Sequence, residues 1–236
     1  MTTYFIHGFL EDNSMWEKIH FPPQMQPRFI EIPGHGNKLH DSCPEKMIEI
    51  AQLIAPELED TEFNIIGHSM GGYLIGSLLE IGIRPQKIGL FHSKLGEDHA
   101  QKREQRRRAI DLVKENKLLY IKTMISNLFS PDQKESFKEI IGVLVQHALP
   151  ISIETITHCQ LAMMNRMDGI SIVRELSIPT FYFAGNQDQS VPMEQIDGEK
   201  KLLAELAQVT KIQDIGHMGH IEAPHAFSDW MEKNFN

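Results

Sequence analysis

A serine set between small residues, directly after an apolar run, most constrains how this chain can fold. Positions 67–72 read Gly-His-Ser-Met-Gly-Gly. The β-branched run 63–66 predicts a buried strand, and apolar residues at helical spacing after Ser69 predict a helix that ends near Gly82. Ser69 is therefore expected on a sharp strand-to-helix turn, where only small neighbours such as Gly67 and Gly71 let the strand and the helix approach closely. A glycine-rich turn with a capping serine is the ordinary alternative.

Strands and helices alternate in the sequence on both sides of a long helical stretch. Short connections between alternating strands and helices favour a doubly wound, mainly parallel sheet of about six strands. The expected strands are residues 3–6, 28–32, 63–66, 87–92, 179–185 and 209–212. The expected helices of this part start near Asp41–Glu45, at residue 70, at Met193 and near Pro224, and a capping side chain with a proline in the first turn supports the first of these starts.

The alternation stops between residues 96 and 174, where the pattern is helical throughout. Apolar residues recur over residues 102–116, 118–128, 134–148 and 153–164, so this block is expected to be a packed helical insertion. We therefore expect a core domain of residues 1–95 and 175–236, with residues 96–174 as a lid or cap.

Two groups of side chains in the expected insertion have alternative interpretations. The charged face of the insertion is expected to be a solvated helix surface, with a site for an acidic substrate as the alternative; it includes Arg103, Arg106, Arg107 and Arg108 among glutamates. The methionines of the insertion are core residues or, if the insertion covers Ser69, pocket-lining residues; they are Met124, Met163, Met164 and Met167.

Composition narrows the functional classes. The chain has 236 residues and a formal net charge of −9, which argues against a nucleic-acid-binding role. Its two cysteines, Cys43 and Cys159, have no metal-type spacing and fit a reducing compartment better than a disulfide framework. The N-terminal segment has no basic stretch followed by a long apolar one, so a cytoplasmic location without membrane insertion is expected.

Two later strand ends supply the groups that a nucleophilic serine needs. A serine requires a base, and the base requires an orienting acid. Asp188 follows the strand 179–185 and His217 follows the last strand, so both are expected at the same sheet edge as Ser69, because parallel strands deliver their C-terminal ends to one side. Asp214 is a weaker candidate for the acid, and His220 is an alternative base.

A hydrolytic intermediate also needs hydrogen-bond donors aimed at its oxyanion. The backbone amides of Met70 and Phe9 are the candidates, the latter in the loop 7–10 after the first strand, although an ordinary turn explains this loop as well.

A metal site is the alternative interpretation of the histidines. The pairs His217 with His220 and His35 with His40 lack a third ligand at convincing spacing, so no metal and no cofactor are expected.

Together these motifs resemble the α/β-hydrolase superfamily, in its branch of small lidded esterases and lipases. The matching segments are residues 7–9 with Trp16, 33–36, 67–72, 185–192 and 216–224. The resemblance implies that His217, the first histidine of the last segment, is catalytic. Family members usually carry a β-hairpin before the strand that leads into His7-Gly8, so a sheet that lacks this hairpin is expected here.

The resemblance implies a serine hydrolase that cleaves a carboxylic ester or a related acyl substrate through an acyl-enzyme. A serine-dependent C–C bond or enol-lactone hydrolase is an alternative, and a slowly turning-over ligand receptor is an alternative of another class. Dehalogenases and epoxide hydrolases of this fold carry an aspartate where this chain has Ser69, which disfavours both. The expected partner is a small acyl substrate, with no nucleic acid or membrane, and the expected state is a monomer or a homodimer.

Overall fold

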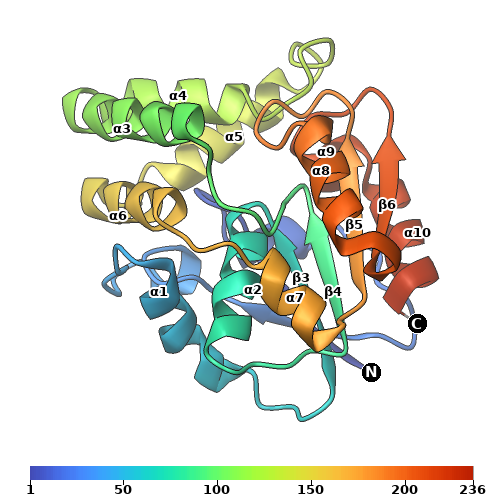
Figure 1. The fold of residues 1–236 in the computed structure, drawn as a ribbon. Coiled ribbons are helices and arrows are strands. Elements are labelled where there is room, and N and C mark those ends of the chain that lie inside the picture. Colours follow the sequence, from blue (N-terminus) through green and yellow to red (C-terminus); the bar gives the residue numbers. More distant parts are fainter. Residues whose placement is uncertain (236) are drawn as a thin grey trace.

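Residues 1–235, which the computed structural model describes, form a six-stranded sheet with helices on both faces (Figure 1). The strands run in the order β2-β1-β3-β4-β5-β6, and every neighbouring pair is parallel. The strands are β1 Thr2–Ile6, β2 Gln26–Ile30, β3 Phe63–His68, β4 Lys87–Phe91, β5 Thr180–Gly185 and β6 Ala207–Ile212. The expected parallel sheet of about six strands is confirmed, and all strands deliver their C-terminal ends to one edge.

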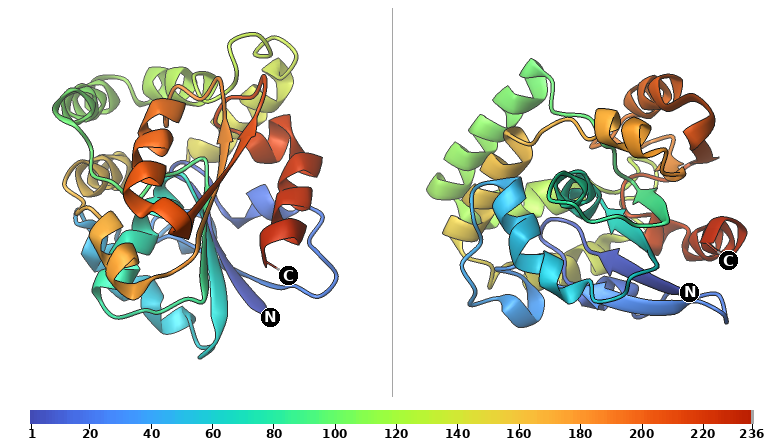
Figure 2. Two further views of the ribbon diagram at one scale, coloured as in Figure 1. Left: turned by 45° about the vertical axis from the view of Figure 1, so that its right-hand side comes forward. Right: turned by 60° about the horizontal axis from the view of Figure 1, so that its bottom comes forward.

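The helices lie on both faces of the sheet and beyond its C-terminal edge. They are α1 Met47–Ile54, α2 Met70–Glu80, α3 Ala100–Glu115, α4 Lys117–Ser126, α5 Lys138–Ala148, α6 Ile153–Met164, α7 Ile170–Leu176, α8 Met193–Leu203, α9 Gly219–Glu222 and α10 Pro224–Phe235. Figure 2 shows α10 on one side of the sheet and α1, α2, α7 and α8 on the other. No single helix of residues 1–235 is long and apolar enough to cross a membrane; only α5 and α6 taken together pass that test, as a pair bent by 103°.

The alternation of side chains along each strand divides the core between the two faces. Tyr4 and Ile6 join one hydrophobic cluster with α1, α2, α7 and α8, whereas Phe5 joins a second cluster with α10. The second cluster is mostly aromatic: Phe91 stacks on Phe227 of α10 with ring centroids 3.9 Å apart. Both faces of the sheet are therefore buried, as an all-parallel sheet requires.

The four helices α3 to α6 lie beyond the C-terminal ends of the strands, and α3 packs on α6 and on α4 (Figure 1). The segment 128–130 between α4 and α5 reaches α9, where the Ser130 amide donates to Glu222 Oε1 at 2.9 Å. The chain between β4 and β5 thus lies against the edge at which the predicted site residues gather.

The first predicted helix start is wrong. Helix α1 begins at Met47, and the segment 41–46 stays extended or bent. The residue before a proline avoids helical angles, which affects Cys43 before Pro44. That segment instead packs on α6: Cys43 lies with its Sγ 3.6 Å from Cys159 Sγ, and its carbonyl accepts a hydrogen bond from His158 Nδ1.

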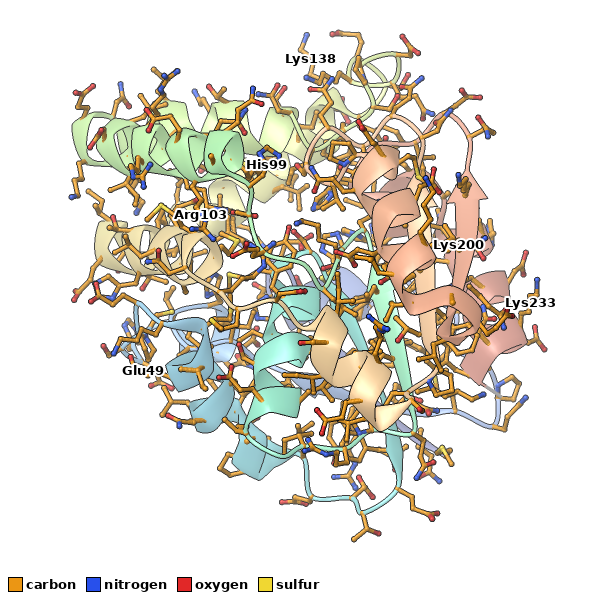
Figure 3. All side chains as sticks on the ribbon, in the orientation of Figure 1. Glu49, His99, Arg103, Lys138, Lys200 and Lys233 are labelled. Atoms are coloured by element: carbon orange, nitrogen blue, oxygen red, sulfur yellow. The ribbon has the colours of Figure 1, made fainter. Side chains whose placement is uncertain are left out.

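The expected solvated arginine face is wrong for Arg106. Its side chain is buried and paired with Asp98, whose other oxygen accepts a hydrogen bond from Arg166 Nη1 at 2.8 Å. Gln160 Oε1 accepts a further hydrogen bond from Arg106. Arg103, on the same helix (Figure 3), follows the expectation: it pairs with Glu97, and both side chains are partly exposed to solvent. Arg106 therefore joins α3 to α6 through a buried ion-pair network.

Candidate active site

Ser69 occupies a strained turn between β3 and α2. Its backbone has φ +49° and ψ −113°, a region that costs a non-glycine residue about 1–3 kcal/mol. A Cβ on Gly67 would collide with the backbone of Gly71 and Gly72, and one on Gly71 would collide with the carbonyl of Ile6. The two glycines are therefore required by the close approach of helix and strand, as the sequence pattern predicts.

The turn after β4 supports the Ser69 backbone. The Ser69 amide donates to the carbonyl of Phe91 at 3.0 Å, and Ser93 Oγ donates to the carbonyl of Ser69 at 2.6 Å. A Cβ on Gly72 would collide with Ser93, so the small residue at 72 makes room for this contact. These contacts hold the unusual backbone angles of Ser69 in place.

Asp188 and His217 come together at the same edge of the sheet. Asp188 follows β5 and accepts a hydrogen bond from His217 Nδ1 at 2.7 Å through Oδ2. Its other oxygen accepts hydrogen bonds from the amides of Ser190 and Val191 at 2.8 and 2.9 Å. Burial alone would raise the pKa of this carboxyl, but His217 and the other donors hold it well below its usual range.

The two weaker candidates lie elsewhere. Asp214 is exposed, and its amide is bound by Asn186 Oδ1. His220 is buried and faces Glu11, with Nε2 3.5 Å from Oε1. Within residues 1–235, neither Ser69 Oγ nor His217 Nε2 makes a hydrogen bond. The structure thus joins the predicted base to the predicted acid and leaves the other ring nitrogen of His217 unengaged.

A second histidine that the sequence analysis missed contacts the same carboxylate. His92 directly follows β4, is fully buried, and has its Nδ1 3.1 Å from Asp188 Oδ2. Burial lowers the pKa of His92 to about 4, although Asp188 opposes this shift, so the ring is neutral at pH 7. Its place at the end of a parallel strand was the available signal, because the same argument placed Asp188 and His217 at this edge.

The loop after β1 carries the predicted oxyanion donor Phe9. His7 fixes this loop: its Nε2 accepts a hydrogen bond from the Ile32 amide at 2.9 Å, and its Nδ1 contacts the Gly8 carbonyl at 2.8 Å. Phe9 and Met70 are buried, and among the described residues neither backbone amide donates a hydrogen bond. Both amides are therefore available to a ligand, whereas the Gly8 amide is bound by Glu11 Oε2 at 3.1 Å.

Glu11 forms a second carboxylate cluster beside this loop, which the sequence analysis also missed. Its Oε2 lies 2.6 Å from His68 Nδ1, and His68 Nε2 lies 3.0 Å from the carbonyl of His217. Burial alone would raise the pKa of Glu11, but the attraction of His68 lowers it to about 2. Burial alone would lower the pKa of His68, but Glu11 raises it. His68 and Glu11 therefore form a buried ion pair behind the strained turn.

Each cluster brings three possible metal ligands within 4.8 Å of one another, namely Glu11, His68 and His220 in one and His92, Asp188 and His217 in the other. Neither matches the histidine pairs weighed from the sequence, because His217 and His220 fall in different clusters and His35 and His40 belong to neither. In both clusters the closest nitrogen–oxygen pair is already hydrogen-bonded, at 2.6 and 2.7 Å. The absence of a metal stays a prediction.

A cavity of about 820 Å³ lies between α5, the loop after β1 and α9. Its lining includes the apolar side chains of Leu10, Val143 and Ile151, and also Glu11 and His220. Ser69 and His217 are not among its lining residues, but Leu10 directly follows the predicted oxyanion donor Phe9. The cavity therefore adjoins the Ser69 site without containing it.

None of the four methionines predicted as possible pocket residues lines this cavity. Met163 is buried with its sulfur against Arg106, Met164 is buried in α6, and Met124 is partly buried against the core. Met167 is 69% exposed after α6. A place for any of them in the space directly over Ser69 stays a prediction.

Comparison with known proteins identifies the family. A sequence profile of the alpha/beta hydrolase family matches residues 4–230, so the chain belongs to this family. No curated protein sequence matches it.

Solved structures agree on the fold. A thermophilic esterase from Thermogutta terrifontis is 22% identical with a TM-score of 0.83, over 99% of this chain and 90% of that one. An esterase from Exiguobacterium antarcticum is 15% identical with a TM-score of 0.81, over 99% and 91%. A bromoperoxidase from Bacillus anthracis is 16% identical with a TM-score of 0.83, over 98% and 90%. At these identities the likeness shows the fold alone.

Proposed function

We propose that this member of the alpha/beta hydrolase family is a serine hydrolase that cleaves a carboxylic ester or a closely related acyl substrate. The observation that carries the proposal is the strained Ser69, at the same sheet edge as the Asp188–His217 pair with its 2.7 Å hydrogen bond. A serine raised on such a turn and an imidazole oriented by a buried carboxylate are two parts of one acyl-transfer mechanism. The esterases among the structural neighbours fit this chemistry.

In the proposed reaction, Ser69 Oγ attacks the carbonyl carbon while His217 Nε2 takes its proton. The amides of Phe9 and Met70 hold the oxyanion of the tetrahedral intermediate, and both are free to do so. His217 then returns the proton to the leaving alcohol, and a water molecule activated by the same imidazole releases the acid. Asp188 keeps the proton of the resting imidazole on Nδ1 and stabilises the imidazolium. Unbound serine hydrolases often tighten the serine–histidine contact only when substrate binds.

The helical segment 96–174 is the proposed lid of this site. Its segment 128–130 contacts the histidine loop directly: the His217 amide donates to the carbonyl of Leu128 at 2.6 Å. Its first long helix reaches the acid loop, where Lys102 Nζ donates to the carbonyl of Ser190 at 3.3 Å. The proposed lid therefore contacts the loops that carry both His217 and Asp188. The 820 Å³ cavity is the proposed site for the apolar part of the ester, and its size lies within the usual range of ligand pockets.

The test is turnover by the Ser69→Ala variant on p-nitrophenyl esters of graded acyl length. We expect kcat to fall by about 10⁴ to 10⁶, because nucleophile and base act as a unit. Ser77→Ala, a change of a buried serine further along the same helix α2, is the matched control and should keep near-native turnover. Near-native activity of Ser69→Ala would exclude the mechanism.

Two alternatives use the same fold, and the substrate panel separates them. A C–C bond or enol-lactone hydrolase would turn over its own substrates in a Ser69-dependent way and leave simple esters almost untouched. A ligand receptor would be labelled at Ser69 by a fluorophosphonate yet turn over neither class. Ester turnover that disappears in Ser69→Ala supports the proposed function against both.

A further inference from the structure

One oxygen of Asp188 serves two histidines. His217 Nδ1 lies 2.7 Å and His92 Nδ1 lies 3.1 Å from Asp188 Oδ2. The two imidazole rings face each other edge to face, with centroids 5.7 Å apart. A triad mechanism requires only one of these histidines, so the second needs an explanation.

The backbone of His92 is held in an unfavourable conformation. Its φ is +47°, which is rare for a residue other than glycine, and its amide donates to the carbonyl of Phe183 at 2.9 Å. The ring is enclosed by Phe91 and Phe183, and a Cβ on Gly219 would collide with its Nε2. The backbone conformation and the packing around His92 therefore hold its Nδ1 towards Asp188.

The chemistry of the ring fixes what it gives to the carboxylate. Within the described residues His92 Nε2 is buried without a hydrogen-bond partner, and Nδ1 contacts only Asp188. A neutral imidazole carries one N–H, which here must be on Nδ1 to donate to a carboxylate. The titratable groups around His92 are Asp188 after β5, His217 before α9, His220 of α9, and His68 at the end of β3, which is itself paired with Glu11.

From this geometry we propose that His92 is a positioning residue, which donates its Nδ1–H to Asp188 Oδ2 and thereby orients the carboxylate. The same hydrogen bond weakens the attraction of Asp188 for the proton that His217 takes up during the reaction. The proposal rests on the proposed Ser69, His217 and Asp188 mechanism. With His92 in place, four N–H groups share the charge of Asp188: two backbone amides on Oδ1 and two imidazoles on Oδ2. A carboxylate that is shared in this way stabilises imidazolium less, so loss of the His92 donor should strengthen that stabilisation.

Two substitutions of similar size separate the hydrogen bond from packing. His92→Asn places an amide N–H close to the position of Nδ1, whereas His92→Leu fills the space without a donor. We expect the acid limb of the kcat/KM profile to move up by about half to one pH unit in His92→Leu, since hydrogen bonds to charged groups are strong. In His92→Asn the acid limb should stay within about 0.2 pH unit of that of the wild type, because the amide N–H replaces the Nδ1–H donor.

The protonation midpoint of His217, followed by ¹⁵N NMR of its ring, gives the same answer without substrate. It should rise in His92→Leu and stay in place in His92→Asn, and one of two downfield Nδ1–H resonances should be lost in His92→Leu. Because this readout needs no turnover, failure of the ester hypothesis and failure of the His92 proposal give different results.

An unchanged midpoint in His92→Leu, or equal movement in both variants, would overturn the proposal and leave His92 a packing residue. If His92→Leu does not fold, His92→Gln takes its place, because its amide reaches the position of Nε2 and leaves that of Nδ1 empty. The proposal then requires the midpoint to rise in His92→Gln relative to His92→Asn, and equal midpoints would contradict it.

Discussion

Two carboxylates on the C-terminal edge of the sheet each lie between two histidines, and the two clusters differ in what remains free. Asp188 accepts hydrogen bonds through both oxygens, and His217 Nε2 has no partner within residues 1–235. Glu11 leaves its Oε1 without a hydrogen bond, and its close partner His68 is engaged through both ring nitrogens. An imidazole that is engaged at both nitrogens holds its proton, whereas one with a free Nε2 can exchange it with a substrate.

The Asp188 and Glu11 clusters contain similar residues but fit different tasks. The Asp188 cluster has the arrangement of an acid–base relay, and the Glu11 cluster has that of a buried ion pair that supports the turn of Ser69 and the loop of Gly8.

The largest effect is expected from removing the charge of Asp188. Asp188→Asn should lower kcat by about 10⁴, because an amide stabilises neither the correct tautomer of His217 nor its imidazolium. Steady-state kinetics on the preferred ester measures it. Asp214→Asn, a change of the exposed competitor acid, is the matched control and should leave kcat unchanged. Comparable losses in both variants would contradict the assignment of the acid.

The corresponding change in the other cluster should act on stability. Glu11→Gln leaves the His68 imidazolium buried without its counter-ion and should lower the free energy of unfolding by about 3–5 kcal/mol. Its kcat, measured well below the unfolding temperature, should fall less than tenfold, far less than for Asp188→Asn. Urea denaturation measures the first effect, with the exposed Glu17→Gln as control. A catalytic loss equal to that of Asp188→Asn at native stability would erase the distinction between the clusters.

Patterns in the sequence predict much of the fold and of the candidate site. A serine between glycines, apolar runs and turn residues lie within a few positions of one another, so the strained turn and the six strands were predictable. Asp188 and His217 were predictable because each follows a strand, and parallel strands deliver their C-terminal ends to one edge of the sheet. The pairings of Glu11, His92 and Arg106 were not, because no local pattern shows which buried groups the packing brings together. The extended segment before α1 escaped prediction for the same reason: its contacts are with α6, about 115 residues later.

Buried neutral histidines in and near both clusters should make the fold sensitive to mild acid. Burial lowers the pKa of His92 to about 4 and those of His35 and His220 to about 3, below the ordinary 6.5. Below pH 6.5 the unfolded chain binds protons that the native protein refuses, so unfolding free energy should fall as pH decreases towards 4, by up to about 1.4 kcal/mol per pH unit for each histidine. His68, whose pKa is raised, opposes this slope near pH 6.5 and above, and at lower pH it is protonated in both states and adds no slope.

Denaturation curves between pH 4 and 7 measure this slope. His220→Asn should reduce it by about one proton, whereas His40→Asn, a change of an exposed histidine, should leave it unaltered. A stability that stays flat over this interval would contradict the neutral state of these rings.

The smallest effect is expected at the cavity beside the Glu11 cluster. Val143 of α5 is 60% exposed and lines the cavity, so Val143→Trp should narrow the cavity. The ratio of kcat/KM for short over long acyl chains should then rise several-fold, because each methylene that loses its place in an apolar pocket costs about 1–3 kcal/mol. The p-nitrophenyl ester series measures this. Leu202→Trp, an exposed position on α8 away from the cavity, serves as control. An unchanged dependence of kcat/KM on chain length would mean that the acyl chain binds outside this cavity.

The most direct test of the Ser69 mechanism is to stop the wild-type enzyme by acid during turnover of a p-nitrophenyl ester and to locate the acyl group by peptide mass spectrometry. We expect an acyl adduct on Ser69, which is absent in Ser69→Ala and decays when the substrate is exhausted. Sustained turnover with no adduct on Ser69, or with the adduct on another residue, would contradict it.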